Sequence, residues 1–144
     1  MQFDPDNKIV QLCAKGMERE MAHQPEEASA LFLQAWQDAG TDLEKFTAAH
    51  YVARHQGSVE DKLKWDMTAL AFALKINDDS MQTSYPSLYL NIAKCYEDLQ
   101  DKENAQKNYE AALSYANELP DTGYGQMIRS GIKNGINRLS GKLA

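Results

Sequence analysis

The sequence has little cysteine, proline or glycine, and each shortage excludes a class of protein. Two cysteines in 144 residues cannot build the disulfide framework of a small secreted domain. Cys13 and Cys95 each fall on an apolar helical stripe, which predicts buried free thiols. Only four prolines and eight glycines interrupt the chain, and most of these glycines lie after Thr122. Long helices are therefore expected over the rest of the chain.

Long apolar runs are also missing. No run approaches the roughly 20 residues of a bilayer-spanning helix, and the first residues, MQFDPDNK, are acidic and polar where a secretory signal would be basic and then apolar. Hydrophobic residues make up 43 % of the chain and charged residues 25 %, which is typical of a globular protein that buries its own core. We therefore expect a cytoplasmic protein with no membrane partner.

Basic residues are scarce except near the carboxyl end. Residues 1–121 hold 11 Lys and Arg against 21 Asp and Glu, whereas residues 122–144 hold four basic residues and no acidic one. A nucleic-acid surface normally needs a larger basic field, and this acidic body would repel phosphate, so no nucleic-acid partner is expected. The basic segment is predicted to form an internal contact, a homodimer contact or a solvated helix face.

Apolar spacing, capping residues and helix breakers predict a single all-α domain of about seven helices over residues 1–144. Asp42 is a candidate N-cap, and the connector from Asn77 to Pro86 is expected to be extended. Six helices form three pairs, within 6–39, 42–76 and 84–118, and a capping helix covers 122–140. The paired helices are expected at 6–23, 26–39, 42–56, 59–76, 84–99 and 102–118.

The clearest pattern lies between Leu88 and Leu113. There a small residue is followed at set intervals by a small, an aromatic and another small residue, and the first pair repeats the same intervals. A small residue lets the partner helix approach while the ring fills the space beside it, so each set predicts a tightly packed helical hairpin. The two sets are Ala93, Ala105, Tyr109 and Ala112, and Gly16, Ala28, Phe32 and Ala35.

The middle pair departs from this pattern. With Ala53 taken as the small residue of its first helix, we compare Lys62, Asp66 and Ala69 of its second helix with the repeat, and only Ala69 fits. Trp65 is expected to supply the bulk that the Asp66 side chain lacks. We interpret the middle pair as a degenerate repeat.

The hairpin pattern of the first and third pairs resembles the tetratricopeptide repeat (TPR) family. This resemblance implies a right-handed α-α superhelix, a TPR-like solenoid, in which the first helix of each pair lines a concave groove. It further implies that the groove binds a peptide or protein segment. The groove-facing positions select six candidate partner-binding residues in this chain. They are Tyr51, Arg54, His55, Asn91, Lys94 and Glu97.

Structural roles stay open for two of these candidates. Tyr51 could be a core ring, and Arg54 could either snorkel to the surface or pair with a neighbouring carboxylate. Some TPR proteins clamp the terminal carboxylate of a peptide with Lys and Asn side chains. The first-repeat positions of that clamp hold Cys13 and Met17 here, so chaperone-tail recognition is not expected.

Chemical motifs give no consistent site. Glu20-x-x-His23 has the spacing of a di-iron helix but stands alone, so no metal site is predicted. The run DTGYG from Asp121 to Gly125 is similar to the start of a nucleotide or S-adenosylmethionine loop, but no strand pattern precedes it, which favours a turn between helices. No spacing pairs a nucleophile with a base. No catalytic residue and no cofactor is therefore expected.

Taken with the TPR resemblance, these observations predict a protein that is not an enzyme. The expected function is a protein–protein interaction or scaffold module that binds an unknown protein or peptide. The alternative is a structural, homo-oligomeric helical-repeat protein in which the groove or the basic last helix meets another copy. For that last helix, the simplest expectation is that it covers the apolar end of the third pair.

Overall fold

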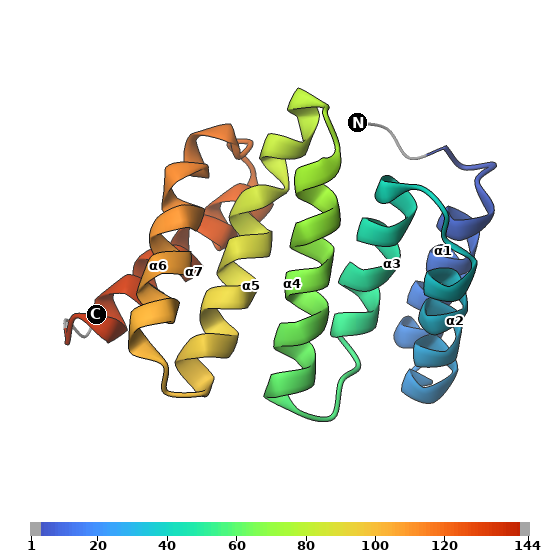
Figure 1. Cartoon of the computed structure of the whole chain (residues 1–144), viewed down its shortest axis with the longest axis horizontal. Coiled ribbons are helices and arrows are strands. Elements are labelled where there is room, and N and C mark those ends of the chain that lie inside the picture. Colours follow the sequence, from blue (N-terminus) through green and yellow to red (C-terminus); the bar gives the residue numbers. More distant parts are fainter. Residues whose placement is uncertain (1–3, 142–144) are drawn as a thin grey trace. The chain divides into compact units, whose positions relative to one another are not determined.

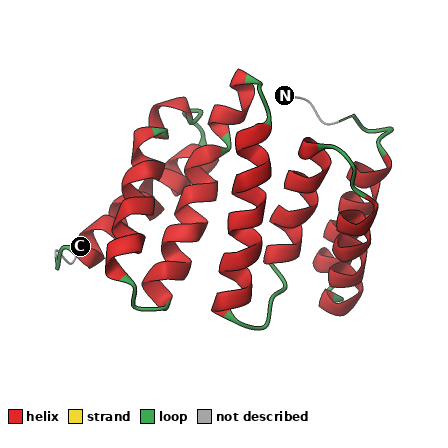
Figure 2. Cartoon of the chain, viewed as in Figure 1, coloured by secondary structure: helices red, strands yellow, loops and turns green. Residues whose placement is uncertain are grey.

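The computed structural model describes residues 4–141, and this part of the chain is helical with no strand (Figure 2). The all-α prediction is confirmed. Seven α-helices and two short 3₁₀ helices follow one another in the order shown in Figure 1. They are α1 (Lys8–Met21), α2 (Pro25–Asp38), α3 (Asp42–Ala53), α4 (Val59–Lys75), η1 (Asp79–Thr83), α5 (Tyr85–Asp98), α6 (Lys102–Ser114), η2 (Ala116–Glu118) and α7 (Gly123–Leu139).

The helices belong to two compact units, residues 1–77 and 78–144, each of which has its own packing. In the first unit α1 pairs with α2 and α3 with α4, and α3 also contacts both α1 and α2. In the second unit α5 pairs with α6, and α7 contacts both of them. The last helix therefore packs on the third pair, as expected of a capping helix.

The two turns that close the outer pairs share an unusual backbone. His23, between α1 and α2, and Gln100, between α5 and α6, both have positive φ, at 58° and 63°. These are the only described residues other than glycine with that conformation, which bulky side chains disfavour. The step along the chain from His23 to Gln100 equals the step from Gly16 to Ala93. The first and third pairs are thus the same hairpin in backbone as well as in sequence.

Packing inside these two hairpins follows the small-to-large rule. A Cβ atom added to Gly16 would lie 2.3 Å from Phe32 Cε1, so only glycine leaves room for that ring. The rings at the two equivalent positions, Phe32 and Tyr109, are fully buried. Both pack among the alanines that the repeat intervals predicted, and Ala28 and Ala35 of the first hairpin are fully buried as well.

The middle pair follows a different register from the predicted one. Thr41 caps α3 as Asn7 caps α1, and His50 follows its cap at the distance at which Gly16 follows its own. The repeat intervals therefore run from His50, and the choice of Ala53 as the starting point was wrong.

A polar pair fills the middle hairpin where the outer hairpins pack a ring. In the corrected register a histidine, His50, replaces the small residue and Asp66 replaces the aromatic one. Asp66 is only 2 % exposed, and Lys62 Nζ lies 2.6 Å from its Oδ2 atom. A buried carboxylate is costly unless it is paired, so this contact explains how the position tolerates an aspartate.

Two predicted boundaries need correction. Thr41, not Asp42, caps α3, because its hydroxyl accepts from the Glu44 amide while the Glu44 carboxylate accepts from the Thr41 amide. The connector after Asn77 is not extended: it forms η1, whose Met81 side chain is buried.

The other sequence predictions that concern burial can be compared directly. Cys13 and Cys95 are buried thiols that form no disulfide, as predicted, and burial raises the pKa of the Cys13 thiol to about 11. Among residues 4–141, none of the helices is both long enough and apolar enough to cross a bilayer. The last helix, predicted at 122–140, runs from Gly123 to Leu139.

Candidate functional site

The first-unit candidates meet at one carboxylate. Glu20, near the end of α1, is contacted by two side chains that follow the last turn of α3. His55 Nε2 lies 2.7 Å from Glu20 Oε2, and Arg54 Nη2 lies 3.3 Å from Glu20 Oε1. The Glu20 and His55 side chains are both 17 % exposed, whereas that of Arg54 is 48 % exposed. The contact of His55 is therefore mainly structural, and Arg54 keeps half of its surface available.

The Tyr51 ring packs against the same group of side chains. Its ring stacks on the buried Phe32 ring, with centroids 5.1 Å apart and planes inclined by 15°. The Arg54 guanidinium lies over the Tyr51 ring at 5.4 Å, and His55 also stacks on Phe32, at 5.6 Å. Both structural alternatives considered for these residues thus describe part of their role. Tyr51 belongs partly to the core, and Arg54 does pair with a carboxylate.

In the second unit Glu97 is fully engaged. Arg138 of α7 donates from Nε to Glu97 Oε2 at 2.8 Å and from Nη2 to Glu97 Oε1 at 3.0 Å. The Tyr109 hydroxyl donates to Glu97 Oε1 at 2.6 Å. These hydrogen bonds, with Arg138 the largest contributor, lower the pKa of Glu97 to about 2. Glu97 therefore acts first as the point where α7 is attached to the hairpin.

The two remaining candidates differ in exposure. Lys94 is exposed on α5, and its Nζ lies 2.7 Å from Asp98 Oδ1 one turn later on the same helix. Asn91 is half-buried, one turn before Lys94. An exposed pair within one helix contributes little to stability and is readily exchanged for a partner's charge. Of the three second-unit candidates, Lys94 is the one best placed to contact another molecule.

Sequence reasoning missed Arg138, although a signal for it exists. Glu20 and Glu97 occupy the same hairpin position, each one helical turn after the small residue of its repeat. Arg54 and Arg138 each lie in or just after the helix that follows its hairpin. An acidic residue repeated at one hairpin position, with an arginine associated with each following helix, predicts a repeated ion pair. The structure contains it in both units.

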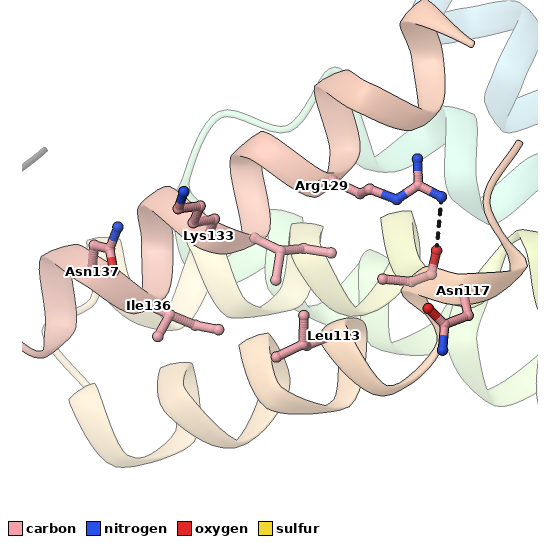
Figure 3. A pocket seen from close by; sticks show the side chains of 8 residues that line it. Leu113, Asn117, Arg129, Lys133, Ile136 and Asn137 are labelled. Carbon is pink, nitrogen blue, oxygen red and sulfur yellow. Dashed lines mark hydrogen bonds between the residues drawn. The ribbon is translucent and has the colours of Figure 1, made fainter. Parts of the chain in front are cut away.

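A pocket of about 500 Å³ opens between the end of α6 and the outer side of α7 (Figure 3). The Leu113 and Ile136 side chains project into it, while Lys133 and Asn137 extend from α7. Arg129 closes one end, donating from Nη2 to the carbonyl oxygens of Ala116 and Leu119. The sequence predicted none of the lining residues as a site. They are Leu113, Ala116, Asn117, Arg129, Ile132, Lys133, Ile136 and Asn137.

The chemical motifs that the sequence raised adopt other roles. Glu20 bonds to His55 and not to His23, which lies exposed in the turn between α1 and α2. Within residues 4–141, no group of three or more His, Cys, Asp or Glu side chains could hold a metal ion. In the DTGYG run, Asp121 ends the connection after η2, Thr122 caps α7, and Gly123 to Gly125 form the first turn of α7.

No family model matches this chain, and neither a curated protein nor a solved structure is significantly similar to it.

Proposed function

We propose that this protein is a non-enzymatic interaction module of TPR-like helix pairs, which binds a peptide or protein segment along the first helices of its pairs. The observation that carries this proposal is the Arg54–Tyr51 contact. Glu20 and the Tyr51 ring hold the guanidinium in place while half of the Arg54 side chain stays exposed. An arginine that is ordered before binding loses little conformational entropy when a partner arrives, and arginine and tyrosine are enriched among energetically dominant interface residues.

The second unit adds Lys94 and Asn91 on its own first helix. Lys94 is exposed and exchangeable, while Glu97 and His55 mainly hold the helices that present the binding groups. We therefore infer that in the first unit Arg54 gives a cationic contact and Tyr51 an apolar one, and that in the second unit Lys94 gives a cationic contact. The expected partner is a segment with at least one carboxylate. We also propose that the protein is cytoplasmic and that its helix pairs form a TPR-like superhelix.

The test is a comparison of two double variants in a binding assay. Arg54→Gln with Lys94→Gln removes one cation from the proposed surface of each unit. The control, Lys64→Gln with Lys107→Gln, also removes one exposed cation from each unit, but from α4 and α6, the second helices of their pairs. Equal charge loss separates a specific surface from general attraction to an acidic or basic partner.

Partners captured from lysate by the immobilised wild-type chain should be lost with the first variant and kept with the control. Circular dichroism should show the same helical content for both. Capture that survives the loss of Arg54 and Lys94 would refute the assignment of these residues.

Self-association is the second candidate function, favoured by exposed apolar side chains on the last helix. Met127 is 62 % exposed and Tyr124 is 49 % exposed, both on α7. Such side chains can meet a second copy. Light scattering across concentrations distinguishes the two functions, because a mass that stays monomeric excludes the homo-oligomer.

A further inference from the structure

The last helix packs on its hairpin as α3 packs on the first. Residues of the α3 region and residues of α7 that make the same kinds of contact are always separated by the same number of positions in the sequence. Lys45 and Arg129 both donate to backbone carbonyls near the end of the preceding helix. Arg54 and Arg138 both pair with the hairpin glutamate. The equivalent apolar pairs are Ala48 with Ile132 and Val52 with Ile136, each packed on its own hairpin core.

In the first unit the outer side of this arrangement is covered by α4. Trp36 of α2 meets Trp65 of α4 edge to face at 5.1 Å and Phe72 of α4 at 5.9 Å. Ala49 and Ala53 lie about 100° around α3 from the stripe that faces the first hairpin, and they are buried. Since α3 contacts only α1, α2 and α4 extensively, α4 is the helix that covers these two alanines.

In the second unit the equivalent surface has no helix on it within residues 4–141. Leu113 occupies the position that Trp36 has in the first hairpin, and it is 55 % exposed. Lys133 and Asn137 occupy the positions of Ala49 and Ala53. These residues line the pocket of Figure 3. The pocket therefore lies where the second helix of a fourth pair would pack.

We propose that this α6–α7 pocket receives an acidic amphipathic helix from a different protein, which packs there as α4 packs in the first unit. A helix is the expected occupant, because the equivalent surface of the first unit is covered by a helix, α4. The apolar floor of Leu113, Ile132 and Ile136 calls for a bulky side chain, in the role that Trp65 and Phe72 play against Trp36.

Charge decides what the docking helix must carry. Where α4 meets two alanines, the docking helix meets the amide of Asn137 and Lys133, which is exposed and has no ion pair within the described chain. Arg129 adds a second cation, whose hydrogen bonds go to carbonyl oxygens and not to a carboxylate. Residues 122–144 contain no acidic side chain to balance these cations. Acidic residues on the docking helix therefore complement the rim.

A second copy of this chain is the less suitable occupant. Helices α1 to α6 each bury an apolar stripe within their own pair, so a second copy would have to release one of them to fill the pocket. The exposed side chains of α7 could reach a second copy, but α7 has no acidic residue to complement the cationic rim. The partner helix lies on the outer side of α6 and α7, and none of the residues assigned to the proposed peptide surface lines it. The proposed peptide surface and the proposed helix-docking pocket can therefore be tested independently.

The probe for this site comes from the chain itself. A fluorescein-labelled peptide with the sequence of α4, residues 59–75, is made with Glu in place of Ala69 and Ala73. These two alanines are fully buried, so they mark the face that meets α3. A second peptide carries Lys at both positions. Binding to the full-length protein is followed by fluorescence anisotropy at low salt and again at about 0.5 M salt, where screening removes surface attraction.

The Glu peptide should bind the wild-type protein, and Lys133→Glu should weaken it by at least about tenfold through charge repulsion. The matched variant Lys107→Glu, at another exposed lysine on α6 outside the pocket, should change the affinity by less than about twofold. The Lys peptide should prefer the Lys133→Glu protein. Leu113→Lys should abolish binding of both peptides, because it places a charge on the apolar floor.

Absence of saturable binding by the Glu peptide overturns the proposal, and so do equal affinities for the Lys133→Glu and Lys107→Glu proteins. A dimer in light scattering that Leu113→Lys dissolves assigns the face to a second copy, which also overturns it. Circular dichroism of each variant shows whether the fold is kept. Because Arg54 and Lys94 are unchanged throughout, these outcomes do not bear on the proposed peptide surface.

Discussion

The two units fix the same carboxylate position with different donors. In the first unit both partners of Glu20, Arg54 and His55, come from the end of α3. In the second, Arg138 comes from α7 and the Tyr109 hydroxyl comes from inside the hairpin. The arginine is the shared element, while the second partner has moved from the following helix into the hairpin. Both units thus share an ion pair between the hairpin glutamate and an arginine in or just after the third helix, while the second hydrogen-bond donor to the glutamate differs.

The two units use different donors to the glutamate because side chains of different size occupy two pairs of equivalent positions. Tyr51 of the first unit stacks on Phe32, whereas its equivalent in the second unit is Gly135. A Cβ atom on Gly135 would lie 2.2 Å from Tyr109, so the glycine makes room for a larger ring whose hydroxyl reaches Glu97. Relative to the first unit, α7 lacks one bulky side chain and α6 carries one additional hydroxyl.

The largest effect is expected from removing the buried ring of either hairpin. Phe32→Ala and Tyr109→Ala should each lower the free energy of unfolding by about 3–5 kcal/mol, because a fully buried aromatic side chain leaves a cavity. Tyr109→Ala should cost more, since it also removes a donor to Glu97. Urea unfolding followed by hydrogen exchange resolves the two units. A ring that can be removed at no cost from one hairpin would break the equivalence.

A smaller effect should distinguish the two glutamates. Glu97→Gln should destabilise the second unit by about 1.5–3 kcal/mol, because hydrogen bonds to a charged group are lost. Glu20→Gln should cost the first unit less, since Arg54 approaches at 3.3 Å through one atom while Arg138 makes two shorter bonds. Exchange rates of amides in α1 and α5 measure each effect. Equal losses would show that donor geometry does not set the strength of the pair.

Acidification should destabilise the two units at different pH values, with smaller effects than the substitutions above. Burial lowers the pKa of His50 below its ordinary value of 6.5, an effect that Arg54 and Lys62 reinforce and Asp66 opposes. The unfolded chain therefore takes up a proton first, and the first unit loses stability as pH falls below about 6.5. The Glu97 pKa is lowered from 4.5 to about 2, so its stabilisation is complete above pH 4.5 and is lost between pH 4.5 and 2.

Hydrogen exchange at about pH 7, 5.5 and 3 should accordingly show the first unit weakening before the second. The control is His50→Gln, which keeps a polar side chain and removes the titration. If the first unit of this variant still weakens on mild acidification, the histidine is not the cause.

The sequence was most informative about contacts between positions close along the chain. Gly16 and Phe32 lie on the two helices of one hairpin, so their spacing was enough to predict the contact. Arg138 and Glu97 are much farther apart in sequence, and pairing them requires knowing how α7 lies on α5 and α6. The register of the middle pair was wrong because a histidine in a glycine position gives no small-residue signal.

The candidate site was predictable in position but not in use. The groove-facing phase implied by the TPR resemblance selected Tyr51, Arg54 and His55, and these side chains lie near one another beside Glu20. Phase alone could not tell which of their atoms a neighbour already occupies. Glu20 illustrates this limit, since a helical spacing of three suggested His23 while the positive-φ turn removed that residue from the helix face.

The unequal length of two connectors has a consequence for engineering. The segment before α7 is longer than the one before α3, yet Arg138 reaches the same glutamate position of its hairpin that Arg54 reaches. The docking of the third helix is thus insensitive to the length of the loop that leads to it. That loop offers an insertion point at its exposed residues, where an epitope or a fluorescent reporter could be inserted between Pro120 and Asp121 while the helices on either side keep their register.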